Sequence, residues 1–287
     1  MQSVPNSAGT SSPKAVAPGG ACDSHIHIYD PRFEMPLPQR RPVANATVAD
    51  YRLLQRRIGT SRAIVVQPAA FGTDNRVTVD AVQALGMDRA RGVGVLHPDV
   101  TDAELHCLHA GGIRGLRFTL HDPRTAVTSP EMIEPLGRRI HELGWHVQLH
   151  LLADQLVDLG AIVDRLPGTV VIDHMARLPQ PLGLAHPAFA RLRGWLDNGR
   201  TWVKLSGAYL DTRTGPPRYE DVGAVARELA RIAPQRLVWG SDWPHPTEAG
   251  SKPDDAALFD LVREWTGSGA LFERVLVDNP AKLYGFD

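Results

Sequence analysis

Eight short apolar runs recur along the chain, and most are followed by a stretch in which apolar residues recur at helical spacing. Runs that are apolar on both faces and rich in Val and Ile are typical of buried parallel strands. The predicted strands are Cys22–Ile28, Ala63–Pro68, Gly92–Pro98, Ile113–Phe118, Trp145–Leu151, Thr169–His174, Trp202–Gly207 and Arg236–Asp242. Eight strands alternating with helices over about 265 residues predict an α/β fold, the (β/α)8 barrel.

A doubly wound parallel sheet shows the same alternation, and the strand count alone does not exclude it. However, neither G-x-G-x-x-G nor G-x-x-x-x-G-K-[ST] opens a predicted helix, which argues against that fold. Among the helices, one is expected to start at Thr47, one at Ser129-Pro130 and one near Asp254. We also expect a single helix through Leu156, Leu159 and Val163, and a tail from residue 271 whose NPAKLYGF segment packs on the outside of the barrel.

Composition and charge argue against several classes of protein. The 31 Lys and Arg nearly balance the 32 Asp and Glu, so a nucleic-acid or anionic-membrane surface is not expected. Two cysteines are too few for a disulfide scaffold, no apolar run approaches the ~20 residues of a membrane span, and the first twenty residues lack the apolar core of a secretory signal. We therefore expect a cytoplasmic protein, with residues 1–20 as a flexible arm and residues 21–287 as one barrel domain.

Histidine and aspartate lie at the C-terminal ends of three predicted strands. His25 and His27 are two residues apart, so both point to one face of the first strand, the barrel interior. His174 ends the sixth strand and Asp242 the eighth. Because active sites of such barrels lie at the C-terminal ends of the strands, these four residues are expected to meet. They predict either a site for one divalent metal or a hydrolytic acid–base cluster. A pair of hydrogen-bonded core histidines is the structural alternative, and the presence of His174 and Asp242 argues against it.

A second group of candidates is basic or polar. Arg117 on the fourth strand and Arg124 in the following loop carry guanidinium groups, which bind carboxylates in bidentate fashion. Arg114 faces away from Arg117 if the strand is regular, although Gly115 can mark a bulge, and we leave Arg114 outside the site. The further substrate-binding candidates, all near predicted strand ends, are Gln67, Gln148, Lys204, Tyr209 and His245.

Four segments resemble the amidohydrolase superfamily: CDSHIHIYDP, IDHMARLP, VWGSDWPHP and VDNPAKLYGF. They are most similar to its branch of 2-pyrone-4,6-dicarboxylate and sugar-lactone lactonases, which includes a D-galactarolactone isomerase. The resemblance runs from Ala21 to Phe286 and is specific for the branch, not for the substrate. It implies a distorted (β/α)8 barrel that opens cyclic esters, often esters that carry a carboxylate.

The resemblance also implies roles for residues. By position, the branch's first-strand histidine pair falls on His25 and His27, its sixth-strand histidine on His174 and its eighth-strand aspartate on Asp242. Its substrate-binding arginine region falls on Arg117, with Arg124 nearby. Metal-rich members carry a bridging Lys or Glu on strand four or five, but here Gln148 lies near that position, so a binuclear centre is not expected. Our first expectation is that no cofactor is required. The alternative is one Zn²⁺ held by His25, His27, His174 and Asp242.

The leading hypothesis is hydrolysis of a small carboxylated lactone, a sugar-acid lactone or a pyrone dicarboxylate. Asp242 would activate a water molecule, and His25, His27 and His174 would bind the developing oxyanion. One alternative is a lactone isomerase, in which a substrate hydroxyl replaces water, and another is a zinc-dependent decarboxylase. A catalytically silent scaffold is the fourth reading, and the complete polar cluster argues against it. The expected partner is a small molecule, and a homo-oligomer is left open.

Overall fold

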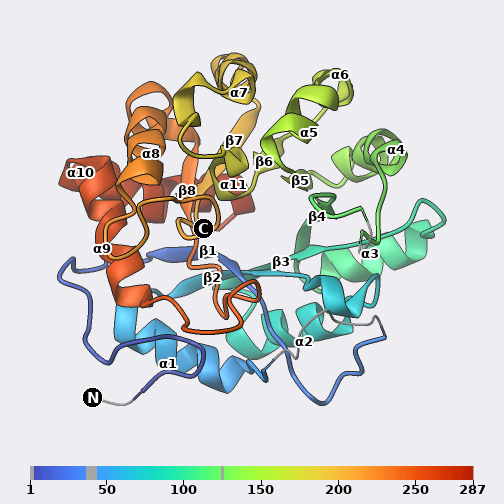
Figure 1. The fold of residues 1–287 in the computed structure, drawn as a ribbon. Helices are drawn as coiled ribbons and strands as arrows, with labels where there is room; N and C mark the ends of the chain where they lie inside the picture. The colour runs from blue at the N-terminus through green and yellow to red at the C-terminus, as the bar shows by residue number, and fades with distance from the viewer. Residues whose placement is uncertain (1–2, 37–43, 124–125, 287) are drawn as a thin grey trace.

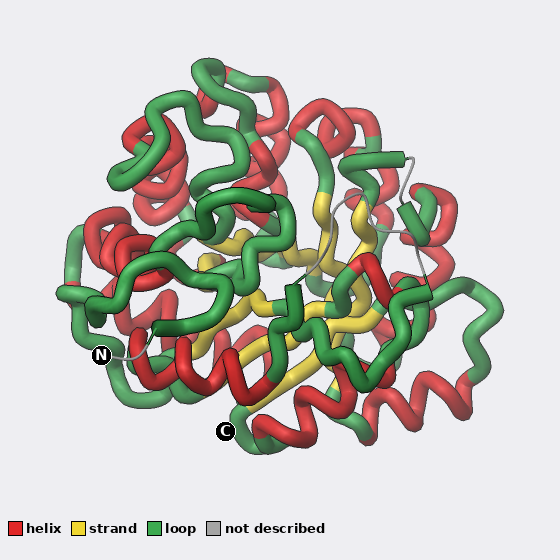
Figure 2. Tube along the Cα trace, turned by 60° about the horizontal axis from the view of Figure 1, so that its bottom comes forward, coloured by secondary structure: helices red, strands yellow, loops and turns green. Residues whose placement is uncertain are grey.

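Eight parallel strands form one sheet in the order β1 to β8, which confirms the predicted (β/α)8 architecture in this computed structural model. The structure describes residues 3–36, 44–123 and 126–286. The strands are β1 (Cys22–Ile26), β2 (Arg62–Val66), β3 (Ala90–Gly94), β4 (Ile113–Thr119), β5 (His146–His150), β6 (Val170–Ile172), β7 (Thr201–Leu205) and β8 (Leu237–Trp239). They occupy the centre of the molecule and helices surround them (Figures 1 and 2).

The barrel closes between the first and last strands through residues that follow β8. The backbone N–H of Asp242 donates to the His25 carbonyl at 2.9 Å, and that of His27 donates to the Trp243 carbonyl at 2.8 Å. Gly240 permits this approach, because a Cβ there would lie 2.5 Å from the Cβ of His25. The buried Asp23 carboxylate also accepts from the Ser241 hydroxyl at 2.6 Å. The closure thus places the end of β8 directly against His25 and His27.

The helices follow the strands and cover the sheet from outside. The longer ones are α1 (Val48–Ile58), α2 (Arg76–Leu85), α3 (Asp102–Ala110), α4 (Pro130–His141), α7 (Pro187–Asp197), α8 (Glu220–Ile232) and α9 (Asp255–Thr266). The shorter ones are α5 (Ala153–Asp158), α6 (Gly160–Arg165), α10 (Gly269–Glu273) and α11 (Asn279–Tyr284). The expected starts of α1, α4 and α9 are confirmed, and Thr47 forms a capping box with Asp50. No helix among the described residues is long and apolar enough to cross a membrane.

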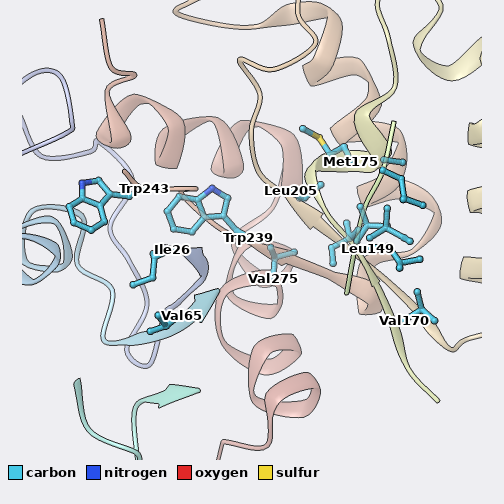
Figure 3. Packing of buried hydrophobic residues seen from close by; sticks show 14 of the residues in the cluster. Ile26, Val65, Leu149, Val170, Met175, Leu205, Trp239, Trp243 and Val275 are labelled. Atoms are coloured by element: carbon cyan, nitrogen blue, oxygen red, sulfur yellow. The ribbon is translucent and has the colours of Figure 1, made fainter. Parts of the chain in front are cut away.

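Two apolar clusters make the core. The larger one joins the helices to strand residues such as Val65 and Leu149, and Figure 3 shows part of it. The smaller one contains strand residues of the opposite parity, such as Ile64 and Val66 on β2. Because neighbouring strand residues point to opposite faces, the smaller cluster fills the inside of the barrel.

Two local predictions are wrong. The helix expected through Leu156 and Val163 is two short helices, α5 and α6, which meet at Leu159. The NPAKLYGF tail does not pack on the outside, because Tyr284 and Phe286 join the smaller cluster inside the barrel. The tail therefore closes the end of the barrel opposite the candidate site.

The described part of the N-terminal segment, residues 3–20, lies along α1 and α9. The Asp260 carboxylate accepts from the backbone N–H of Ala15 at 2.8 Å, and Arg57 Nε donates to the Ser11 carbonyl at 2.8 Å. Trp243, which follows Asp242, donates its indole N–H to the Pro5 carbonyl at 2.8 Å. The segment thus contacts the back of the loop that follows β8.

Candidate active site

His25 and His27 meet at the C-terminal end of β1, as predicted. Their Nε2 atoms are 3.3 Å apart, and both side chains are buried. His27 Nδ1 lies 2.8 Å from the carbonyl oxygen of Val66, which only accepts hydrogen bonds. The Nδ1 atom of His27 therefore carries a proton, and in the neutral ring its Nε2 lone pair faces the site.

Asp242 completes this group. Its Oδ1 atom lies 3.6 Å from His25 Nε2 and 3.5 Å from His27 Nε2. Burial alone would raise the pKa of Asp242, but the interactions with His174, His27 and His25 outweigh it and hold this pKa well below its usual range. Asp242 has a φ of 63°, an unfavourable backbone conformation for a residue with a Cβ. Such outliers are common at functional sites, where the surrounding structure holds them in place.

His174 reaches the same place through a left-handed turn. The four residues from His174 to Arg177 all have φ between 50° and 62°. The His174 ring lies 4.9 Å from the His25 ring, and its Nδ1 is 2.8 Å from the Ser206 hydroxyl. Burial lowers the pKa of His174 to about 4, so its ring is neutral at neutral pH. The predicted set of three histidines and one aspartate is therefore assembled at one end of the barrel.

A buried charged network lies behind His25, and its centre is Asp173. The Asp173 carboxylate accepts from Arg117 Nε at 3.0 Å and from Gln148 Nε2 at 3.1 Å. Lys204, which is fully buried, donates to Gln148 Oε1 at 2.9 Å and lies 3.7 Å from Asp173 Oδ1. Burial lowers the pKa of Lys204 to about 8, although the Asp173 charge opposes this. Two cations and one carboxylate thus share a buried region, in which only Arg117 keeps a small exposed fraction.

This network controls the tautomer of His25. Asp173 Oδ1 and Lys204 Nζ each lie 3.4 Å from His25 Nδ1, one as an acceptor and the other as a donor. If Lys204 donates to Nδ1, the His25 proton is on Nε2 and points toward Asp242. If Nδ1 donates to Asp173, the Nε2 lone pair points there instead. Burial and the Lys204 charge lower the pKa of His25 well below its ordinary value.

The other predicted residues have distinct positions. Tyr209 donates to Asp242 Oδ2 at 2.7 Å, and its oxygen is 2.9 Å from His245 Nδ1. The Gln67 amide donates to the Asp74 carbonyl at 2.8 Å and accepts from Thr78, so Gln67 holds the loop after β2. Gln148 and Lys204 contact each other beneath His25, as described above.

Arg124 lies outside the described residues. Arg114 donates to the His109 carbonyl, away from the site, and a register irregularity between β3 and β4 lies at this point.

Three functional candidates escaped the sequence analysis: Asp173, Arg177 and Asp255. Asp173 adjoins His174, and neighbours on a regular strand point to opposite faces. The left-handed turn removes this alternation, and no periodicity in the sequence predicts it.

Arg177 Nη1 lies 3.4 Å from His150 Nε2, while Arg117 Nη2 lies 3.0 Å from His150 Nδ1. Both arginines thus contact the His150 ring, and each is also paired with a carboxylate, Arg177 with Asp211 and Arg117 with Asp173.

The donor set fits one metal ion. His25, His174 and Asp242 offer ligand atoms that all lie within 4.8 Å of one another. The triangle of His25 Nε2, His27 Nε2 and Asp242 Oδ1 has edges of 3.3, 3.5 and 3.6 Å. Ligands about 2.0–2.1 Å from a tetrahedral zinc ion are separated by about 3.3–3.4 Å. The residues could thus hold a single zinc ion.

Comparison with known proteins identifies one matching family and several similar enzymes. The family model described as amidohydrolase matches residues 22–286. A 2-pyrone-4,6-dicarboxylate hydrolase of Comamonas testosteroni is 36% identical over 287 residues, covering 96% of this chain and 94% of its own. A 4-sulfomuconolactone hydrolase of Rhizobium radiobacter is 36% identical over 275 residues, covering 93% and 91%. A D-galactarolactone isomerase of Agrobacterium fabrum is 32% identical over 277 residues, covering 95% and 93%.

Proposed function

Because the chain belongs to the amidohydrolase family, we propose that it hydrolyses a small carboxylated lactone to the open-chain acid. The observation that carries this proposal is the buried Asp242 carboxylate, which faces two imidazoles and lies in one site with the buried cation Arg117. The names of two relatives denote lactones with acidic substituents, which an arginine would bind. In this proposal, residues 21–287 act as one catalytic domain.

Asp242 acts as the general base in this reaction. It removes a proton from a water molecule as the water oxygen attacks the lactone carbonyl carbon. The carbonyl oxygen becomes negatively charged, and N–H groups of the His25 and His174 rings stabilise it. When the intermediate collapses, the bond between the carbonyl carbon and the ring oxygen breaks. The proton held by Asp242 then goes to that ring oxygen, which becomes a hydroxyl group.

A metal ion at this site would be held by His25, His27, His174 and Asp242. When bound, zinc would supply a Lewis acid for the carbonyl and lower the pKa of water. The charged side chains around the site favour a reaction without a metal ion. Arg117 and Lys204 both pair with Asp173, and their two positive charges equal in number the carboxylates of Asp173 and Asp242, so a divalent ion would give this group of side chains a net positive charge.

Metal removal tests this part of the proposal. We expect protein that has been stripped with a chelator to keep kcat within about twofold of the zinc-loaded protein, because Lys204 can place the His25 proton toward Asp242 without a metal. Turnover is followed by proton NMR and zinc content by elemental analysis. A loss of tenfold or more on stripping, restored by one equivalent of zinc, would show that the metal is required.

Arg117 is proposed to bind the acidic group of the substrate. We expect Arg117→Met to raise KM by about 10- to 100-fold and to lower kcat less, because a carboxylate clamp acts in ground and transition states alike. Arg114→Met is the matched control, since Arg114 lies on the same strand but bonds to the His109 carbonyl away from the site. Equal KM values in the two variants would place the clamp elsewhere.

Isomerisation is the second candidate function, and the Agrobacterium relative supports it by name. The same base could deprotonate a substrate hydroxyl in place of water, which would convert one lactone ring into another. Proton NMR with a panel of carboxylated lactones separates the two reactions. Hydrolysis produces an open-chain acid, whereas isomerisation produces a new ring signature and no acid.

A further inference from the structure

A chain of hydrogen-bonding side chains leads from Asp242 to the start of α9. Tyr209 contacts Asp242 Oδ2 at 2.7 Å and His245 Nδ1 at 2.9 Å. On the far side of the ring, His245 Nε2 lies 3.2 Å from Asp255 Oδ2. His245 and Asp255 are both fully buried. Both ring nitrogens of His245 are therefore occupied by Tyr209 and Asp255, and these two contacts account for its position without a bond to a substrate.

The direction of the hydrogen bonds follows from the number of protons. A tyrosine hydroxyl has one proton, and a carboxylate can only accept, so the Tyr209 proton points to Asp242. The Tyr209 oxygen must then accept from His245, which requires a proton on Nδ1. One more proton lies between His245 Nε2 and Asp255. All three contacts are satisfied only in this arrangement.

The hydrogen bond from Tyr209 also gives the two carboxylate oxygens of Asp242 different roles. Oδ2 accepts from Tyr209, whereas Oδ1 faces His25 and His27. A carboxylate that is held at one oxygen by a hydrogen bond keeps its other oxygen in a fixed direction.

The backbone around Asp242 needs such support. Both Asp242 and His245 have positive φ, 63° and 56°, which costs energy for residues with a Cβ. The side-chain bond from His245 to Asp255 ties this loop to α9. Lys252 adds a second tie by donating to the His245 carbonyl at 2.8 Å.

We propose that Tyr209, His245 and Asp255 are a buried positioning chain that aims Oδ1 of Asp242 at the attacking water. The inference rests on the proposed function, in which Asp242 is the general base. His245 and Asp255 act only through Tyr209, and they contact neither water nor lactone. Removing any member leaves the base present but poorly directed, so kcat falls while substrate binding persists.

A double-mutant comparison tests this dependence. We expect Tyr209→Phe to lower kcat by about 10- to 100-fold with KM changed less than threefold. His245→Gly should lower kcat to a similar extent, and the double variant should be no more than threefold worse than the poorer single variant. Tyr284→Phe is the matched control, because it removes a buried hydroxyl at the opposite end of the barrel. Multiplicative losses, or a rise in KM with kcat retained, would overturn the proposal.

A conservative variant of His245 distinguishes a loss of Asp242 positioning from a loss of stability in the loop after β8. Glycine and asparagine both tolerate the φ of 56° at position 245, so His245→Gly and His245→Asn cause similar backbone strain. Only asparagine offers an N–H close to the position of Nδ1. We expect His245→Asn to recover at least tenfold of the kcat lost in His245→Gly. Equal kcat values in the two variants would contradict a positioning role.

A spectroscopic readout needs no substrate. In long-range ¹H–¹⁵N spectra of protein with labelled histidine, His245 is expected to carry a proton on Nδ1, and this signal should shift in Tyr209→Phe. A bare Nδ1 in the wild-type protein would overturn the inference. Failure of the proposed function would instead appear as no turnover of any lactone by the wild-type protein, with the His245 signal as expected.

Discussion

Asp242→Asn is expected to lower kcat by about 10³-fold or more while the protein stays folded. The amide has no basic oxygen that can take the proton of water, and general-base catalysis is worth about 10²–10⁴-fold. The change is nearly isosteric, and the backbone N–H of Asp242 keeps its bond to the His25 carbonyl. The effect should therefore appear in kcat, with a thermal midpoint within a few degrees of the wild type.

Asp221→Asn is a suitable control for this substitution. The Asp221 carboxylate accepts from the Thr212 and Thr214 hydroxyls at 2.6 and 2.8 Å, in the loop before α8. The control should lose some stability and keep its kcat. Turnover by Asp242→Asn above one tenth of the wild-type value would remove Asp242 from the role of general base.

The sequence predicts the barrel well because its signals are local. Each strand is a short apolar run, and the observed strands fall inside or within two residues of the predicted ranges. The C-terminal limits are less accurate, since β8 ends at Trp239 whereas the prediction extends to Asp242. The three residues after Trp239 are buried without being a strand, so burial alone does not set the strand end.

The site is only partly predictable, because its geometry depends on departures from regular structure. His25, His27, His174 and Asp242 are named correctly as neighbours from their places at strand ends. Asp173 is missed because alternation points it away from His174. Only the left-handed turn that begins at His174 allows both side chains to reach the interior. Four consecutive residues keep positive φ values there because the surrounding fold holds them, and no residue pattern predicts this turn.

The role of Lys204 illustrates a second limit. From the sequence, a lysine at the end of a strand resembles a substrate-binding cation. In the structure its ammonium group is fully buried and paired with Gln148 and Asp173. The partner that decides this role, Asp173, lies 31 positions earlier in the chain, and only the adjacent packing of β6 and β7 brings the two together.

Asp173→Asn is expected to affect both stability and activity. The substitution leaves two buried cations, Arg117 and Lys204, without the carboxylate that they share. Removing one partner of a buried ion pair costs about 3–5 kcal/mol. Roughly 2–4 °C of thermal midpoint is lost per kcal/mol in a domain of comparable size, so a decrease of about 6–20 °C is expected in a melting experiment. We also expect kcat to fall by about 10²-fold, because His25 loses its orientation, and KM to rise, because Arg117 loses its own.

Adding Lys204→Met to Asp173→Asn distinguishes the two effects. Taking away the second charge removes one uncompensated cation, and replacing a buried pair by an apolar side chain is often close to neutral for stability. The double variant should therefore recover several degrees of the lost midpoint. Its kcat should stay low, because neither Asp173 nor Lys204 remains to set the tautomer of His25. If kcat recovers together with the midpoint, Asp173 supports only the fold, and the network behind His25 has no part in the reaction.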